Sequence, residues 1–202
     1  MYVDGFNLYH AISDLGRPYL KWIGLKALAN TYLEKADTLI GVTYFTALQT
    51  KDPGKYQRHI AYIDALEATG VEVIRSKFVK GKKYCAAYDR NCKFDFEKQT
   101  DVAISVRVLA DVYAGIVDKV LLLTADSDQI PLVRHIRDQF PKVCVEIAAP
   151  PGRMQEAREL CAAAHAFREA KPGRLQSCLL PRNVIGDDGQ VAAICPGAYL
   201  PN

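Results

Sequence analysis

Two aspartates, Asp126 and Asp128, follow a short apolar run in the second half of the chain. The run before them, residues 120–123, is continuous and apolar, which is typical of a strand covered on both faces of a parallel sheet. Residues 129–140 then resume an apolar rhythm at helical spacing. A strand, an acidic tip and a helix place both carboxylates at the carboxyl end of a strand, where doubly wound sheets build their active sites.

Two further aspartates occupy comparable positions. Asp4 ends a short first strand, and Asn7 lies about one helical turn beyond it. Asp101 lies near the start of a helix predicted over 97–116, one turn before an apolar stripe on the same helix. We therefore expect Asp101 on the helix face that packs on the sheet, and not on the solvent face.

These aspartates share one chemistry if they converge at one edge of the sheet. Carboxylates that lie so close repel one another, and a bound cation relieves the repulsion. Oxygen ligands suit hard divalent ions, so we expect Asp4, Asp101 and Asp126 to bind Mg²⁺ or Mn²⁺, with Asp128 and Asn7 as further catalytic residues. Such a site activates water and stabilises phosphoryl oxygens during phosphodiester hydrolysis.

Each aspartate also has a purely structural explanation. An isolated pair such as Asp126 and Asp128 more often caps a helix, Asp4 can serve as a turn residue, and Asp101 suits a helix start. A solvated glutamate in a first helical turn explains Glu97 at least as well as a role in the site. The shared position of the aspartates at one sheet edge favours a functional site over four separate structural roles.

Length and composition restrict the class of protein. The chain has 202 residues, of which 50% are hydrophobic, enough for one large domain or a domain with an appendage. It shows no apolar run of membrane-spanning length and no signal-peptide pattern at its N-terminus, so we expect a cytoplasmic protein with reduced cysteines. The net charge of +3 is compatible with a nucleic-acid partner but too weak to argue for one.

Strand-like and helix-like segments alternate along the chain. This alternation predicts an α/β sandwich with a mostly parallel sheet of about five strands. The expected strands cover 2–3, 39–48, 71–78, 120–123 and 143–148, and the expected helices cover 8–12, 20–33, 55–69, 97–116, 129–140 and 154–167. We expect residues 1–170 to form the domain and residues 171–202 to form a C-terminal extension packed on it.

The segment 79–95 interrupts the alternation with a basic and aromatic composition typical of a hairpin or loop. Basic groups follow phosphates and aromatic rings stack on bases in single-strand binding, although a solvated loop explains the composition equally well. The residues expected to bind RNA in and next to this segment are Lys80, Lys82, Lys83, Arg90, Lys93 and Lys98.

Three blocks of residues, 2–9, 97–102 and 124–128, together resemble the motifs of the NYN domain family, in its LabA-like branch within the PIN-like nucleases. The resemblance implies a PIN-like three-layer sandwich and a metal-dependent ribonuclease site. It maps the acids of the family onto Asp4, Asp101, Asp126 and Asp128, with Asn7 beside them.

Two departures from the family pattern stand out. Ala125 occupies a position where many relatives carry glycine, which alters the turn before Asp126. Some relatives also carry a C-x-x-C zinc knuckle, whereas Cys85 and Cys92 here are widely spaced and supply only two of the four ligands of a tetrahedral site.

The expected function is therefore that of a metal-dependent ribonuclease, with endonucleolytic action, water as the nucleophile and RNA as the partner. Homodimer formation is left open, and no membrane association is expected. One alternative is a non-catalytic RNA-binding or regulatory module of the same fold. A phosphohydrolase with a D-x-D motif ranks lower, because that class places the motif on its first strand, where this chain has Asp4.

Overall fold

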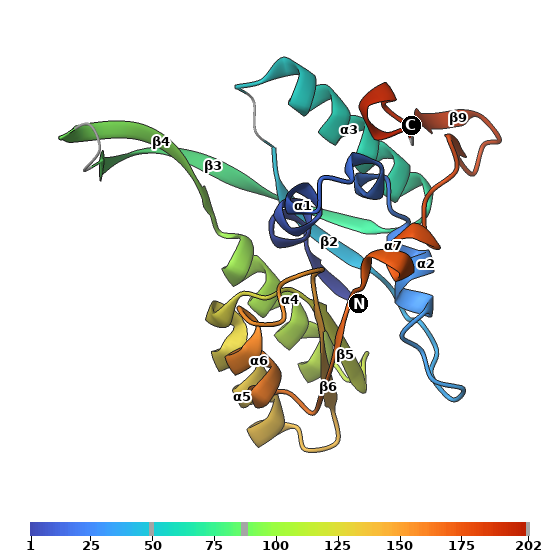
Figure 1. Ribbon diagram of the computed structural model, residues 1–202. Coiled ribbons are helices and arrows are strands. Elements are labelled where there is room, and N and C mark those ends of the chain that lie inside the picture. Colours follow the sequence, from blue (N-terminus) through green and yellow to red (C-terminus); the bar gives the residue numbers. More distant parts are fainter. Residues whose placement is uncertain (49–50, 86–88, 201–202) are drawn as a thin grey trace.

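The computed structural model describes residues 1–48, 51–85 and 89–200 (Figure 1). For residues 78–80, 82–83, 85 and 91–98 it describes the backbone alone. The described residues form one main sheet of seven strands in the order β4-β3-β2-β1-β5-β6-β7. The strands are β1 (Tyr2–Asp4), β2 (Thr43–Ala47), β3 (Glu72–Cys85), β4 (Arg90–Lys98), β5 (Lys119–Leu123), β6 (Cys144–Ala149) and β7 (Ala166–Glu169). Every neighbouring pair is parallel except β3 and β4.

Helices cover both faces of this sheet (Figure 1). The first face carries α1 (Gly5–Asp14), the 3-10 turn η1 (Pro18–Lys21), α2 (Leu25–Asn30), α3 (Pro53–Ala68) and α7 (Pro172–Gln176). The second face carries α4 (Thr100–Tyr113), the 3-10 turn η3 (Ser127–Gln129), α5 (Ile130–Gln139) and α6 (Arg158–Ala163). The expected α/β three-layer sandwich with a mostly parallel sheet is therefore confirmed.

The strands explain why two separate cores form. Side chains alternate between the faces of a strand, so Val3 and Leu123 pack into one core while Tyr2 and Leu122 pack into the other. All four side chains are buried, and burial of each large apolar side chain contributes about 1.5–3 kcal/mol. The continuous apolar run of β5 therefore reflects burial on both faces.

The sheet has two more strands than the five that the sequence predicts. β4 arises from the predicted hairpin segment, and β7 replaces the end of the helix predicted over 154–167. β7 pairs with β6, where Arg168 on β7 donates hydrogen bonds to Glu146, whose side chain is buried. Because a buried carboxylate needs a partner, this tertiary contact prevails over the local helical pattern.

The helix predicted over 97–116 begins later, at Thr100. Residue Gln99 lies between β4 and α4 with a φ of 80°, in the left-handed region that ends regular structure. Lys98 and Glu97 therefore belong to the strand, and α4 starts immediately beyond the hairpin.

The β3–β4 hairpin projects away from the body of the molecule (Figure 1). At the other side of the molecule, a small antiparallel pair, β8 (Asn183–Ile185) and β9 (Val191–Ile194), and the 3-10 turn η4 (Gly197–Tyr199) follow α7. The C-terminal residues contact the core: Gly24 N–H donates to the Cys178 carbonyl at 2.7 Å, and Tyr199 is buried. None of the described helices is both long and apolar enough to cross a bilayer.

Candidate active site

Asp4 stands at the carboxyl end of β1 and caps the N-terminus of α1. Its Oδ1 accepts the backbone N–H of Asn7 at 3.0 Å, and its Oδ2 accepts the Thr124 hydroxyl at 2.9 Å. The residue is 5% exposed. These two hydrogen bonds hold the Asp4 carboxylate in one orientation.

The chain beyond β5 is fixed next to Asp4. β1 and β5 are parallel neighbours, which brings the segment after Leu123 to the tip of β1. Thr124, fully buried, donates to Asp4 and accepts the N–H of Asp126 at 3.1 Å. The Asn7 side chain accepts the N–H of Ala125 at 3.2 Å. Asn7 therefore orients the segment that carries Asp126.

Asp126 has the capping role that its sequence pattern allows. Its Oδ1 accepts the N–H of Asp128 at 2.9 Å, at the start of η3. Capping occupies one lone pair of one oxygen, so it does not exclude a second role for the same carboxylate. Asp128 itself is exposed and projects from η3 outside the group that the other three aspartates form.

Asp101 lies in the first turn of α4, and its side chain is exposed, so the prediction that it avoids the solvent face is wrong. Asp101 is the second residue of α4, so no preceding helical turn covers its side chain, which explains the difference. Burial of part of the carboxyl group raises the pKa of Asp101 above its usual value, and the charges of Asp126 and Asp128 raise it further. Asp101 therefore lies within electrostatic reach of both.

Gln129 joins the two acidic segments and was not identified from the sequence. It is fully buried, its Nε2 donates to the Asp101 carbonyl at 3.3 Å, and its Oε1 accepts the Ser105 hydroxyl at 3.1 Å. Thr124 was also missed as a site residue. The available signal in both cases is a polar residue inside an otherwise apolar strand or helix start, which needs partners once it is buried.

Asp4, Asp101 and Asp126 form one group, called here the acid group. One carboxylate oxygen from each residue lies within 4.8 Å of the others. The three residues come from separate elements: β1, the start of α4 and the segment after β5. The fold therefore brings together three of the four aspartates that the sequence predicts as neighbours.

The donor set of the acid group fits a hard divalent cation. All the donors are carboxylate oxygens, which Mg²⁺ and Mn²⁺ prefer. Two oxygens on opposite sides of one Mg²⁺ ion lie about 4.2 Å apart, because each metal–oxygen distance is about 2.1 Å. The carboxylate oxygens of the acid group all lie within 4.8 Å of one another, which is the scale of such a coordination sphere.

The residues expected to bind RNA lie on the hairpin. The backbone register pairs Lys82 with Lys93 and Lys77 with Lys98, and Arg90 is exposed. The remaining predicted side chains lie outside the described part of the structure: Lys80, Lys82, Lys83, Lys93 and Lys98. The same holds for the side chains of Cys85 and Cys92. The hairpin ends at Lys98, three residues before Asp101, so its base adjoins the acid group.

The sequence matches a known family. The chain belongs to the NYN domain family, which matches residues 1–171. The resemblance that the three sequence blocks indicate is thereby confirmed at the level of the family. The acid group is a possible metal site in this context.

Two individual proteins are similar over most of the chain. One is 6-hydroxy-3-succinoylpyridine 3-monooxygenase HspA of Pseudomonas putida (strain DSM 28022 / S16), 25% identical over 92% of this chain and 71% of the relative. The other is the crystal structure of VPA0982 from Vibrio parahaemolyticus RIMD 2210633, a protein of unknown function. It has a TM-score of 0.55 and 22% identity, over 89% of this chain and 93% of that chain, which supports the fold alone.

Proposed function

We propose that this protein is a metal-dependent ribonuclease that hydrolyses RNA phosphodiester bonds endonucleolytically. One observation carries the proposal: three aspartates from separate segments place carboxylate oxygens within 4.8 Å of one another on an NYN domain. A purely structural role for each aspartate does not explain why the three carboxylates meet, because their mutual repulsion destabilises the fold without a cation.

The proposed roles follow from the contacts. Asp4, Asp101 and Asp126 hold Mg²⁺ or Mn²⁺, and a divalent cation there lowers the pKa of water and stabilises charge on phosphoryl oxygens. Thr124 and Asn7 keep Asp4 and the Asp126 segment in place through their hydrogen bonds. Asp128 adds negative charge close to Asp101, which strengthens the attraction for the cation.

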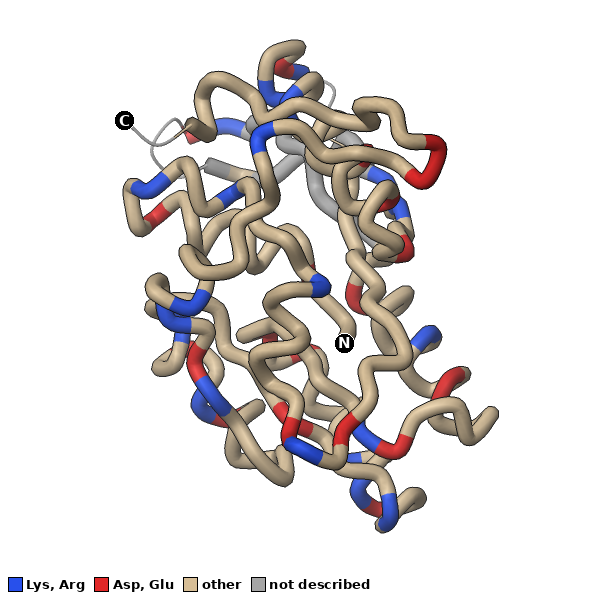
Figure 2. Tube along the Cα trace, turned by 90° about the vertical axis from the view of Figure 1, so that its right-hand side faces the viewer, with Lys and Arg blue, Asp and Glu red and all other residues tan. Residues whose placement is uncertain are grey.

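The β3–β4 hairpin supplies the proposed RNA contact. Its basic residues lie on an arm that extends from the body beside the acid group (Figure 1). Figure 2 shows basic and acidic positions interspersed over another face of the molecule, without a block of one sign in its described part. The hairpin therefore brings a group of basic residues next to the proposed metal site.

A cleavage assay tests the proposal. Incubation with a mixed single-stranded RNA in Mn²⁺ or Mg²⁺ should give cleavage that a chelator abolishes. Asp101→Asn should lower the rate by about 100-fold or more, since a catalytic cation supplies several kcal/mol to the transition state. The matched control is Asp138→Asn, because Asp138 is an exposed acid on α5 outside the acid group.

Two results would contradict the ribonuclease proposal. Cleavage that persists in chelator, or equal rates for Asp101→Asn and Asp138→Asn, would remove the acid group from the reaction. Tight RNA binding without cleavage in either metal would favour the alternative of a non-catalytic RNA-binding module.

A second candidate function comes from the printed activity of the Pseudomonas relative, oxygenation of a succinoylpyridine. The observation that favours it is a pocket of roughly 300 Å³ beside the acid group, lined by aromatic and basic side chains. Oxygen uptake that depends on 6-hydroxy-3-succinoylpyridine and a reductant, together with no cleavage of RNA, would replace the ribonuclease proposal with this one.

A further inference from the structure

The pocket lies at the same edge of the sheet as the acid group but does not include it. It is lined by residues of α1, η1, β2, α3 and η4 and has a volume of roughly 300 Å³. Gly5, which directly follows Asp4, and Thr46, at the end of β2, line its inner side. Asp4 is in register with Phe45, whose chain neighbours Tyr44 and Thr46 line the pocket, so the pocket and the acid group both lie near the carboxyl ends of β1 and β2.

Aromatic rings form rigid walls of this pocket. Tyr44 and Tyr62 pack edge to face with centroids 5.8 Å apart, and the Tyr62 hydroxyl donates to the Ile23 carbonyl at 2.8 Å. A Cβ on Gly5 would lie 2.5 Å from the Tyr44 ring, so the backbone approaches this ring as closely as glycine allows. Tyr9 and Tyr199 contribute from α1 and η4. Preset aromatic surfaces of this kind favour a planar, largely apolar ligand.

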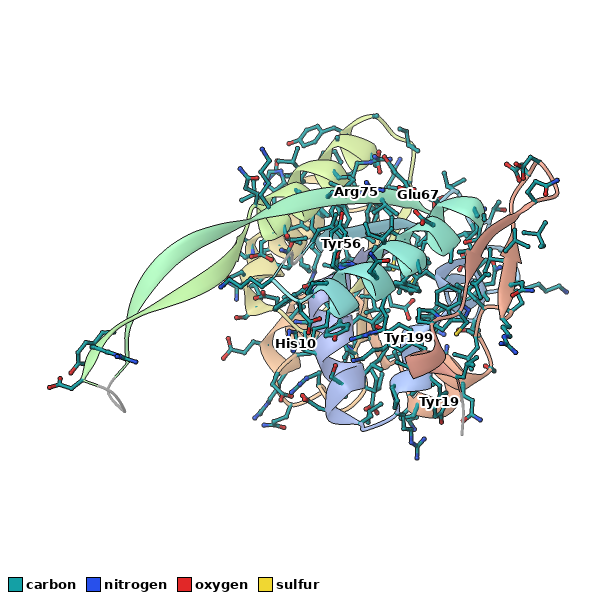
Figure 3. All side chains as sticks on the ribbon, turned by 90° about the horizontal axis from the view of Figure 1, so that it is seen from above. His10, Tyr19, Tyr56, Glu67, Arg75 and Tyr199 are labelled. Atoms are coloured by element: carbon teal, nitrogen blue, oxygen red, sulfur yellow. The ribbon has the colours of Figure 1, made fainter. Side chains whose placement is uncertain are left out.

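Figure 3 looks down on α3 and shows His10 of α1 and Tyr199 of η4 on the same side of the molecule. Both residues line the pocket, together with three basic residues, Lys21, Lys55 and Arg58. Lys21 Nζ lies 4.0 Å from the centroid of the Tyr9 ring, and Arg58 hydrogen bonds to the Tyr199 hydroxyl.

The charged side chains that line the pocket are therefore all basic. None of the residues that line it, all of them within the described part of the chain, is an aspartate or a glutamate. A concave site lined by one sign of charge attracts ligands of the other sign. His59 adds a polar contact instead of a charge, because its ring hydrogen bonds Thr46 at 3.0 Å and burial lowers its pKa to about 4.

We propose that this pocket binds a planar aromatic ring that carries an anionic group. A volume near the lower end for ligand pockets suits one ring system with its anion and is too small for an oligonucleotide. The same chemistry has two sources: one nucleotide of an RNA strand that crosses the acid group, or a free aromatic acid. The inference goes beyond the ribonuclease activity, because binding in this pocket needs no divalent cation.

Isothermal titration calorimetry on the full chain, in chelator, tests the proposal with four probes. The two anions are uridine 5′-monophosphate and nicotinate, and their neutral counterparts are uridine and nicotinamide. At least one anion should bind, about tenfold or more tighter than its neutral counterpart, as expected for a charge-assisted contact. Selective binding of the nucleotide indicates RNA as the source, selective binding of nicotinate indicates a free acid, and binding of both indicates that ring and charge suffice.

Variants locate the binding in the pocket. The double substitution Lys55→Gln and Arg58→Gln should weaken the anion about tenfold and leave the neutral probe unchanged. Tyr9→Ala should weaken both, because it removes a ring. Lys26→Gln is the matched control, because Lys26 is exposed and outside the pocket.

Three results would overturn the proposal: no heat of binding for either anion at millimolar concentration, equal affinity for anion and neutral counterpart, or the same loss in the control as in the double variant. Because divalent metal is absent throughout, none of these results depends on the ribonuclease proposal, and a failed cleavage assay leaves the pocket proposal standing.

Discussion

At the scale of single residues, the acidic motif has a structural and a proposed chemical role at once. Asp126 caps η3 and joins the acid group, and Asp4 caps α1 while Thr124 holds its second oxygen. A capping explanation and a metal explanation are therefore not exclusive. Only experiments that add and remove the cation distinguish the capping explanation from the metal explanation.

His59 gives a prediction about pH. Burial, and then the charge of Arg75, lower the pKa of His59 from 6.5 to about 4. Between pH 6.5 and pH 4 the imidazole of His59 takes up a proton in the unfolded chain but stays neutral in the folded chain. The contribution of His59 to stability is therefore complete above pH 6.5 and decreases as the pH falls towards 4. His59→Gln should remove this loss. Between pH 7 and pH 4.5 the wild type should lose about 2 kcal/mol more than the variant.

Denaturant unfolding at the two pH values measures this difference. The control is His135→Gln, since His135 is exposed on α5. If wild type, His59→Gln and His135→Gln lose equal free energy of unfolding, the buried neutral His59 is not the cause.

At the scale of elements, the hairpin is the feature whose function the sequence leaves most open. If it holds RNA, replacing Lys80, Lys82 and Lys83 together with glutamine should weaken binding and flatten its salt dependence. The slope of log K against log salt should decrease by about 2, because each lost contact with single-stranded RNA contributes about 0.7. Fluorescence anisotropy at several salt concentrations measures the slope.

A triple variant of exposed lysines away from the hairpin, Lys26, Lys35 and Lys142, serves as the control. Equal slopes for wild type and both triple variants would show that the hairpin lysines do not contact RNA and that the hairpin is an ordinary solvated segment.

The elements also show how far the sequence can predict this fold. The apolar run before Asp126 and the strand before Asp4 identify two parallel strands and their acidic tips correctly, because burial on both faces leaves a local pattern. Residues 166–167 of β7 fall within the helix predicted over 154–167, because the pairing of β7 with β6 joins segments that are far apart in the sequence and leaves no local pattern. Gln129 and Thr124 were missed for the same reason: their hydrogen-bond partners lie on other elements.

At the scale of the whole molecule, we propose that residues 1–170 form the domain and residues 171–202 an extension packed on it. The support is a set of contacts with Trp22, whose Nε1 donates to the Pro181 carbonyl at 2.9 Å and whose carbonyl accepts the Leu180 N–H at 3.0 Å. Leu175 and Cys178 are buried in the same core.

Deleting residues 171–202 should therefore expose apolar core surface and lower the melting temperature. Several buried side chains at about 1.5–3 kcal/mol each correspond to a decrease of about 10 °C or more in a chain of this size. Differential scanning calorimetry on both proteins measures it. An unchanged melting temperature would show that the extension is not packed on the domain.

The central proposal is that the acid group holds a divalent cation. Thermal melts of wild type, Asp126→Asn and the control Asp138→Asn, in chelator and in Mn²⁺, test it directly. At 100 times the dissociation constant, a ligand of the folded state adds about 2.7 kcal/mol, which corresponds to about 5–10 °C. Wild type and Asp138→Asn should gain this increase. Asp126→Asn should melt no lower than wild type in chelator, since repulsion is relieved, and should gain clearly less from Mn²⁺. Equal gains in all three proteins would contradict the account at its central residue.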